Sequence, residues 1–551
     1  MRMLPSRSLP VGRHYWQAVL VNSQLGSGDM SAALSMVDLL VIGGGVNGTG
    51  IAADAAGRGL SVMLCERADL GGATSSSSTK LIHGGLRYLE TYQFRLVRES
   101  LAEREVLLHA APHIVWPLRF RLPHHKALRP QWMIRSGLFL YDHLSKRVSL
   151  PASHGLKFNE NDPLQPEFGA GFEYSDCWVD DARLVVLNAM QARQHGARIL
   201  TRTACEHIDA QLDPQSKNTT WSARLRDVNN GEERWVNARC IVNASGPWVG
   251  KLGRQLQPQT PPADVRLVKG SHIVVPRMYE GDEAYLLQNP DGRVVFVIPY
   301  EDQFSLIGTT EEEYTGDPAA AAMSPEETAY LLAVASSYFK KAPDASQVLY
   351  HFSGVRPLID DGDENASRVS RDYTLELSRS PAPLLTVYGG KITTYRRLAE
   401  SAMDQLKAVF PDMKPSWTID AYLPGGEFAS QQQLQDDLAG EFPWIDRALL
   451  RSWVRRYGTR TRVMLEGARQ VADLGVSFGE DLYEREIRYL YDQEWAQSAD
   501  DVLWRRTKLG LRLNAEQKAA VARFCQTCLS HENRNPDDEK NKKRILPGQC
   551  L

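Results

Sequence analysis

The chain has 551 residues, which at about 150 residues per domain allows roughly three or four domains. Hydrophobic residues make up 43% and charged residues 24%, which excludes a disordered, collagenous or low-complexity protein. The formal net charge is -3, from 64 Lys and Arg against 67 Asp and Glu, so no global positive field points to nucleic acid, and we expect no nucleic-acid partner.

The cysteines and the apolar runs indicate where in the cell the protein is located. Seven cysteines are scattered along the chain, and an odd, unpatterned set fits a reducing compartment better than a disulfide framework. No run approaches the roughly 18 apolar residues that a membrane-spanning helix needs. We therefore expect a cytoplasmic protein that does not cross a membrane, although it can still lie on one.

Residues 1–36 differ in composition from the rest of the chain. Arginines and serines are frequent there, and Asp29 is the one acidic residue. Transit peptides have this composition. A disordered tail, or a start codon placed too early ahead of Met30 or Met36, is the alternative. We expect an N-terminal extension that lies outside the fold.

The rest of the chain alternates predicted strands and helices. A strand over 37–42, a glycine turn, an alanine-rich helix over 49–58 and a second strand over 60–65 come first. Further strands are predicted at 240–243, 271–275, 293–298, 305–307 and 384–387. After about Gly425 strand signals stop and helical patterns follow. The order predicts an α/β fold, α+β overall, with a helical C-terminal part.

A glycine-rich turn follows the first predicted strand. Gly43, Gly45 and Gly48 stand in G-x-G-x-x-G spacing before the predicted helix. This spacing allows a tight turn, close approach of the backbone to a pyrophosphate, and close packing of helix on strand. Glu66 closes the second strand, where a carboxylate would accept bonds from ribose hydroxyls. The unit predicts dinucleotide binding and favours FAD or NAD over NADP.

A hydroxyl-rich segment then bears on the choice between FAD and NAD. The run 74–80 supplies hydroxyl and N–H groups that suit a buried cofactor, although such a run is often a flexible loop. Paired glycines at 84–85 allow close approach to a flat ligand, and Arg87 and Tyr88 add polar groups. We expect the cofactor to contact Thr74, Ser75, Ser78, Lys80 and Leu81.

Two later segments also have the composition of cofactor contacts. The strand 241–243 leads into small residues around Gly246, where backbone passes close to a ligand. Gly389 and Gly390 follow another apolar run and place N–H groups at a predicted helix start. The alternative for each is an ordinary turn at the end of a strand.

These segments resemble a known family. Residues 41–66 and 78–89 are similar to the bacterial, FAD-dependent, membrane-associated (aerobic) glycerol-3-phosphate dehydrogenases. The similarity continues through segments 95–97, 102–105, 172–184, 269–276, 307–310, 353–357, 389–396 and 500–508. It covers nearly everything after residue 37, whereas residues 1–36 have no recognisable counterpart.

The resemblance implies the fold of the D-amino-acid-oxidase type of flavoprotein. Such a fold has a Rossmann-like FAD domain built from separated segments, an antiparallel-sheet substrate domain and, in this family, a C-terminal helical domain. We expect an extension over 1–36, an FAD-dependent oxidoreductase body over 37–424, a helical domain over 425–535 and a charged tail over 536–551. No calcium-binding loop pattern accompanies it, and Cys525 and Cys528 lack a second pair, so we expect no metal.

The resemblance also implies a reaction. The chain would oxidise sn-glycerol 3-phosphate to dihydroxyacetone phosphate, with hydride transfer from C2 to N5 of FAD, in glycerol catabolism. A membrane quinone would reoxidise the flavin, so the enzyme would be a peripheral protein on the inner face of the cell membrane. An oxygen-dependent glycerol-phosphate or amine oxidase of the same fold is the alternative. A homodimer is one candidate for the oligomeric state.

Candidate substrate and catalytic residues come from the matching segments. The resemblance makes Arg356 the leading ligand for phosphate or oxyanion, with Arg87, Tyr88, Arg371 and Lys391 in support. His272 is the first choice for the base or proton relay, because the usual pKa of histidine lies near the working pH, and His83 competes with it. We expect His272, Arg356 and Lys391 to be catalytic.

Two amphipathic stretches are candidates for membrane contact. Residues 129–147 and 395–410 both combine apolar residues with Lys and Arg at helical spacing. Packing against the protein core is the alternative for each.

Overall fold

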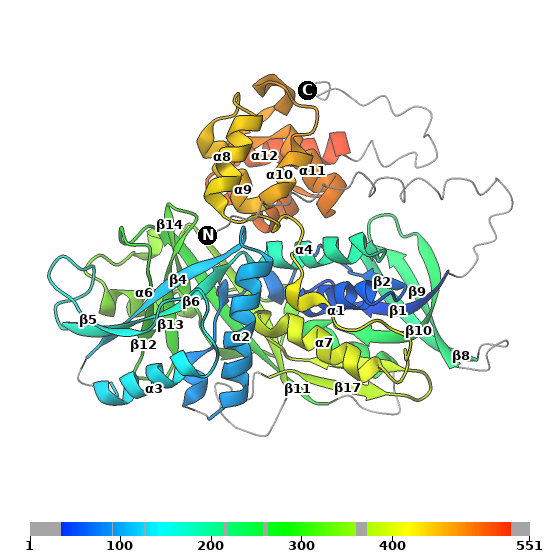
Figure 1. Cartoon of the computed structure of the whole chain (residues 1–551), viewed down its shortest axis with the longest axis horizontal. Coiled ribbons are helices and arrows are strands. Elements are labelled where there is room, and N and C mark those ends of the chain that lie inside the picture. The colour runs from blue at the N-terminus through cyan, green and yellow to red at the C-terminus, as the bar shows by residue number, and fades with distance from the viewer. Residues whose placement is uncertain are drawn as a thin grey trace, which may run out of the picture. The chain divides into compact units, whose positions relative to one another are not determined.

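The predicted strand, turn, helix and strand after residue 36 form one unit of the computed structural model. Strand β1 (Ser35–Ile42) leads through the glycine turn into helix α1 (Val46–Gly57), and strand β2 (Val62–Cys65) pairs parallel with β1 (Figure 1). Helix α1 starts before the predicted Thr49, because Gly48 takes up helical backbone where it packs on the carbonyl of Gly43.

The structure describes only part of the chain: residues 35–529 except 91, 126–127, 213–218, 257–262 and 360–371. The predicted tail over 536–551, and all of the extension over 1–36 except its last residues, lie outside the described residues. Described residues from Met36 onward fall into one unit of internal contacts, so the domain boundary between 424 and 425 stays a prediction.

The first sheet is mixed and carries the parallel pairs of a Rossmann-like domain. Besides β1 and β2 it contains β7 (Arg198–Leu200), β8 (Thr203–Leu212), β9 (Thr219–Asp227), β10 (Glu233–Asn243), β17 (Thr374–Ser378) and β18 (Leu384–Tyr388). Within the described residues the strand order is β17-β18-β10-β1-β2-β7, with β9 beside β10 and β8 beside β9. The β2/β7 and β10/β18 pairs are parallel, and β8, β9 and β10 pair antiparallel in turn.

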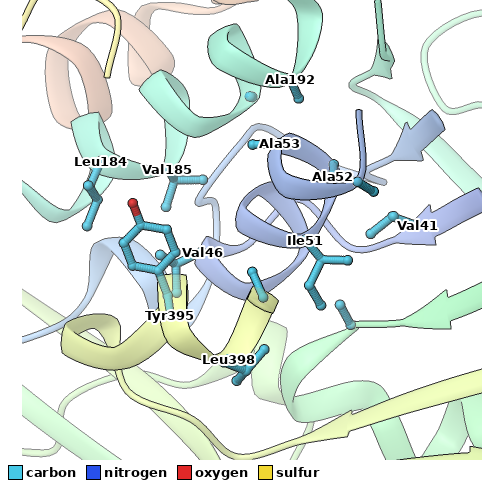
Figure 2. Close-up of a cluster of buried hydrophobic side chains, with 14 of the residues drawn as sticks. Val41, Val46, Ile51, Ala52, Ala53, Leu184, Val185, Ala192, Tyr395 and Leu398 are labelled. Atoms are coloured by element: carbon cyan, nitrogen blue, oxygen red, sulfur yellow. The ribbon is translucent and has the colours of Figure 1, made fainter. Parts of the chain in front are cut away.

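Helix α1 is the centre of the core beside this sheet. It packs against α4 (Asp181–Gln194) and α7 (Tyr395–Leu406), and Figure 2 shows the buried aliphatic side chains that these helices share with β1. Gly50 permits the contact with α7, because a Cβ at this position would lie 2.7 Å from the ring of Tyr395. The apolar face of the predicted amphipathic stretch 395–410 is therefore core, with Leu398 and Met403 fully buried.

The second sheet is mainly antiparallel, as the substrate domain of the predicted fold requires. Its strands are β3 (Leu81–Ile82), β4 (Val115–His124), β5 (His154–Lys157), β6 (Ala170–Val179), β11 (Val265–Pro276), β12 (Ala284–Gln288), β13 (Val294–Tyr300), β14 (Phe304–Gly308), β15 (Glu312–Glu313) and β16 (Tyr350–Ile359). The order is β15-β11-β14-β13-β12-β4-β6-β3, with β16 beside β11 and β5 beside β6. The β4/β12 pair is parallel.

Further helices connect these strands or follow them. The connecting helices are α2 (Phe94–Ala110), α3 (Gln131–His143), α5 (Val249–Leu256) and α6 (Pro325–Tyr338). The C-terminal part has its own apolar cluster and contains α8 (Gln431–Glu441), α9 (Arg447–Tyr457), α10 (Thr461–Met464), α11 (Glu484–Glu494), a π-helix (Asp501–Arg506) and α12 (Ala515–Phe524).

The strand predictions agree with the structure except after Gly425. Each predicted strand between 37 and 387 overlaps an observed one. The expectation that strands stop after Gly425 is wrong, because β19 (Ser477–Gly479) and β20 (Leu482–Tyr483) form a short hairpin. Its turn uses positive φ angles at Glu480 and Asp481, two residue types that give no strand signal.

Substitution of Gly50 tests the packing of α1 on α7. Gly50→Ala places a methyl group against Tyr395, so we expect the free energy of unfolding to fall by about 1–3 kcal/mol. Gly137→Ala is the matched control in α3, where no described atom lies within 4 Å of the added Cβ, and it should be neutral or stabilising by up to about 1 kcal/mol. Urea unfolding measures both. Equal effects of the two changes would contradict the packing argument.

Candidate active site

The turn between β1 and α1 contains two glycines, Gly43 and Gly48, where a side chain would clash with the backbone, and a third, Gly45, that has open space beside it. A Cβ on Gly43 would lie 2.4 Å from the carbonyl oxygen of Ala244, and one on Gly48 would lie 1.9 Å from that of Gly43. A Cβ on Gly45 would meet only the hydroxyl of Ser75, at 3.2 Å. The backbone at Gly45 is thus the place where a pyrophosphate can approach the N-terminus of α1.

Glu66 lies at the predicted end of β2 and is tied to this turn. Its carboxylate accepts hydrogen bonds from the backbone N–H groups of Gly44 and Ala68, each at 2.7 Å. Burial raises the pKa of Glu66, and these two bonds oppose that shift. A carboxylate oxygen has further lone pairs, so these bonds leave acceptor capacity for a ribose hydroxyl.

The segment 74–80 divides into a part near the turn and a part held elsewhere. The hydroxyl of Ser75 accepts from Val46 N–H at 3.0 Å, at the start of α1, and Thr74 donates to the carbonyl of Val355 at 2.6 Å. Ser78 and Lys80 instead bind the buried carboxylate of Asp181, with an Nζ–Oδ1 distance of 2.7 Å for the lysine. Leu81 is buried in β3.

The later glycine segments converge on the same helix start. Gly246, Gly389 and Gly390 all have positive φ, which glycine adopts without strain. A Cβ on Gly246 would meet no described atom within 4 Å. Asn47 donates to the carbonyl of Gly389 at 3.1 Å, and its Oδ1 is buried without a hydrogen-bond partner among the described residues. Sequence reasoning missed Asn47, although it stands inside the glycine motif.

These observations together define a dinucleotide-binding site that fits FAD. Space at Gly45 and Gly246, a buried acceptor on Asn47 and a carboxylate at Glu66 are the features that a bound dinucleotide would use. The described residues contain no group of His, Cys, Asp and Glu that could hold a metal ion.

The predicted substrate ligands lie together, with Arg371 outside the described residues. Arg87 and Arg356 both face the carboxylate of Glu311, at 3.7 and 3.5 Å. The ammonium group of Lys391 lies 3.6 Å from the ring centroid of Tyr88. Burial lowers the pKa of Arg356, and the nearby Tyr88 opposes that shift, which connects the two pairs. The result is a cation cluster in which two arginines face one carboxylate and Lys391 lies over the neighbouring Tyr88.

Glu311 is a member of this cluster that sequence reasoning missed. Its side chain is 10% exposed, and it directly follows the matched segment 307–310. That position was the available signal. Its contacts with the arginines, at 3.5 and 3.7 Å, are longer than the buried 2.7 Å pair of Lys80 and Asp181.

His272 is enclosed beside this cluster. Its Nε2 lies 3.0 Å from the hydroxyl of Thr79, its ring stacks on Phe352, and its Nδ1 has no hydrogen-bond partner among the described residues. Burial, followed by the charges of Lys80 and Arg356, holds the pKa of His272 well below its usual value. The imidazole is therefore neutral at pH 7.

His83, the competing candidate, has a different environment. Its backbone N–H donates to the hydroxyl of Thr393 at 3.3 Å, and its ring meets that of Phe296 edge-on. The roles of His272 and His83 as bases stay predictions.

Comparison with known families and proteins agrees with this site. A model described as FAD dependent oxidoreductase matches residues 38–396, and one described as the C-terminal domain of alpha-glycerophosphate oxidase matches residues 416–538. The glycerol-3-phosphate dehydrogenase of Pseudomonas aeruginosa is 55% identical to this chain over 92% of its length and 98% of the relative. The D-erythritol 1-phosphate dehydrogenase of Brucella abortus is 51% identical over 88% of this chain and 97% of the relative.

A solved structure has the same fold. The glycerol-3-phosphate dehydrogenase of Bacillus halodurans complexed with FAD matches with a TM-score of 0.67 and 25% identity, over 90% of this chain and 94% of that chain. The chain therefore belongs to the FAD-dependent oxidoreductase family. The predicted fold class, the FAD cofactor and the resemblance to the glycerol-3-phosphate dehydrogenases are confirmed.

Proposed function

We propose that this enzyme oxidises sn-glycerol 3-phosphate to dihydroxyacetone phosphate and passes the electrons to a membrane quinone. The observation that carries the proposal is the gathering of Arg87, Arg356 and Lys391 beside the segments that fit FAD. The relative from Pseudomonas aeruginosa, which is named glycerol-3-phosphate dehydrogenase, supports the proposed reaction. A second candidate substrate is a four-carbon polyol phosphate, because one relative is named D-erythritol 1-phosphate dehydrogenase.

The cation cluster suits a phosphate group. Guanidinium groups bind phosphate oxygens with paired, charge-assisted hydrogen bonds, and a lysine adds a point charge. The arginine contacts to Glu311, at 3.5 and 3.7 Å, exceed normal hydrogen-bond length. We infer that Arg87, Arg356 and Lys391 hold the phosphate and that Arg371 assists.

The proposed oxidation needs two acceptors, one for the hydride from C2 and one for the proton of the hydroxyl group. FAD supplies the hydride acceptor, N5 of its ring, when it is bound. The substrate hydroxyl needs an acceptor for its proton, and we propose the neutral imidazole of His272, whose buried Nδ1 makes no hydrogen bond among the described residues. Arg356, whose charge disfavours a protonated His272, would also lower the pKa of a bound hydroxyl. We infer that Lys391 adds a second positive charge for the same step.

The surface of α3 supports contact with a membrane. Trp132 is 67% exposed and Phe139 is 63% exposed, and Met133 and Leu140 are exposed on the same helix. An open groove of about 950 Å³ at the end of α3 is lined by five basic residues and two acidic ones, namely Arg95, Arg98, Lys146, Arg147, Arg397, Glu99 and Asp142. Exposed aromatic residues beside basic ones are typical of peripheral binding to anionic lipid.

Membrane contact by α3 would be peripheral. Within the described part of the chain, no helix is long and apolar enough to span a bilayer. A position on the inner face of the cell membrane would bring the flavin close to its quinone.

The reaction is tested by the colour of the flavin. Anaerobic addition of sn-glycerol 3-phosphate should bleach the flavin absorbance in a stopped-flow experiment, and D-erythritol 1-phosphate should act more slowly. A short-chain quinone should restore the colour faster than oxygen does. Faster reoxidation by oxygen would indicate an oxidase, and no bleaching by either phosphate would refute the proposal.

Substitution of Arg356 tests the phosphate site. Arg356→Lys keeps the charge but loses the paired contact, so we expect the KM for sn-glycerol 3-phosphate to rise by a factor corresponding to about 1.5–3 kcal/mol. Arg293→Lys is the matched control, because Arg293 binds Asp291 and stacks on Tyr330 away from the cluster. Steady-state kinetics measure both. An unchanged KM in Arg356→Lys would remove Arg356 from the site.

Substitution on α3 tests the membrane surface. Trp132→Ala and Phe139→Ala should each weaken binding to vesicles that contain phosphatidylglycerol. Each substitution removes the about 1.5–3 kcal/mol that burial of the apolar side chain in the membrane would contribute. Trp235→Ala, at an exposed tryptophan of β10, is the control. Co-sedimentation with vesicles gives the bound fraction. Equal losses for Trp132 and Trp235 would assign no special role to α3.

A further inference from the structure

The segment 500–508 matches the family but takes no part in the proposed chemistry. It forms the π-helix Asp501–Arg506 of the C-terminal part and the residues just after it. Arg506 donates to both carboxylate oxygens of Asp69, at 2.7 and 2.8 Å, and both side chains are fully buried. Arg505 binds the same carboxylate. The segment thus contacts a loop more than four hundred residues earlier in the sequence.

Asp69 lies in the loop 66–72, which follows β2 and is hydrogen-bonded to the glycine turn. Glu66 accepts from Ala68 N–H, and Gly71 N–H donates to the carbonyl of Gly44 at 2.9 Å. Asp69 stands between these two contacts. A displacement of Asp69 would therefore move the carboxylate expected to meet the ribose and the backbone expected to meet the pyrophosphate.

Lys508 makes a second connection of the same kind. Its Nζ donates to the carboxylate of Asp180 at 2.9 Å. The next residue, Asp181, binds the hydroxyl of Ser78 at 2.8 Å and the ammonium group of Lys80 at 2.7 Å. Lys508 at the end of segment 500–508 therefore binds the residue next to Asp181, which holds Ser78 and Lys80 of the loop 74–80.

Trp504 makes a third connection, to the substrate side. Its ring stacks on that of Tyr350, with 4.1 Å between centroids and an angle of 5° between the planes. Tyr350 begins β16, the strand that carries Phe352, which stacks on His272, and Arg356.

The buried ion pairs around Arg506 fix the positions of the loops that they contact more than they stabilise the fold. Arg506 also donates to the backbone carbonyl of Glu494 at 2.7 Å, and the Glu494 carboxylate pairs with Arg183 of α4. Asp501 pairs with Arg202, whose backbone N–H donates to the carbonyl of Ala68. Buried ion pairs add little net stability compared with apolar packing, because desolvation offsets their attraction, but they accept few alternative arrangements. Such a network suits the fixing of loops.

We propose that segment 500–508 is a positioning element for FAD: by binding Asp69 and Asp180 it fixes the loops 66–72 and 74–80, so that the C-terminal part of the chain sets the affinity for the cofactor. The proposal rests on the FAD contacts inferred for these loops and is independent of the substrate.

The test compares two buried carboxylates with arginine partners in the C-terminal part. Asp69→Asn weakens the pairing with Arg506 and keeps the size of the side chain. Glu486→Gln is the matched control, because Glu486 is buried, accepts from Trp453 and Tyr457 at 3.0 and 2.6 Å and pairs with Arg456, and none of these contacts reaches the loops. The full-length holoenzyme is used without substrate. Flavin fluorescence after dilution gives the FAD release rate, titration of the apoprotein gives Kd, and thermal unfolding gives Tm.

We expect Asp69→Asn to raise the Kd for FAD about tenfold or more, within the range typical of coupling between two sites, and to accelerate release. Glu486→Gln should lower Tm but leave Kd within about twofold of the original protein, because the effect of a buried charge on folding does not itself change a binding site.

Two outcomes would overturn the proposal. An unchanged Kd in folded Asp69→Asn would show that the loops hold FAD without the segment. Equal rises in Kd for both variants would reduce the effect to general destabilisation. If Asp69→Asn does not fold, Arg505→Gln, at a partly exposed side chain that binds the same carboxylate, decides by the same measurements.

Discussion

The close approach of two backbone segments at the start of α1 is the constraint on which the rest of the site depends. A side chain at Gly43 or Gly48 would collide with the carbonyl oxygen of Ala244 or of Gly43 itself. Because both positions lack a Cβ, α1 begins directly at the ends of β1 and β10, with its positive N-terminus beside the space at Gly45. The loop with Glu66 and the glycine pair at 389–390 then pack around that helix start.

Charge is handled differently in the core and at the substrate cluster. Buried cations elsewhere have close carboxylate partners, as Lys80 has in Asp181 and Arg506 in Asp69, at 2.7 Å each. In the cluster, one carboxylate faces two arginines at longer distances. Tight pairs fix structure, because neither partner can leave without a large desolvation cost. We propose this cluster, and not the tight pairs of the core, as the place where the phosphate of the substrate binds.

The sequence allowed prediction of features that depend on neighbours along the chain. The spacing of Gly43, Gly45 and Gly48 between a strand and a helix indicated the nucleotide turn, and Glu66 followed at the end of the next strand. The amphipathic stretch 395–410 was open to two interpretations, since periodicity shows that a helix has an apolar face but not what covers it. The structure shows that α1 and its neighbours cover that face in α7. In α3, Leu138 and Tyr141 are buried, whereas Trp132, Met133, Phe139 and Leu140 stay exposed.

By itself the sequence determined the dinucleotide turn and the mixed fold, because hydrogen bonding and side-chain periodicity act over a few residues. The candidate cations came from the family resemblance. Only the tertiary structure decided which of them meet. Strand register places Arg356 opposite Val268 and His272 opposite Phe352, and it brings Glu311 to the arginines. The tertiary structure also pairs Ser78 and Lys80 with Asp181, and Arg506 with Asp69. Such pairings depend on contacts between segments that lie from tens to hundreds of residues apart, which no local pattern encodes.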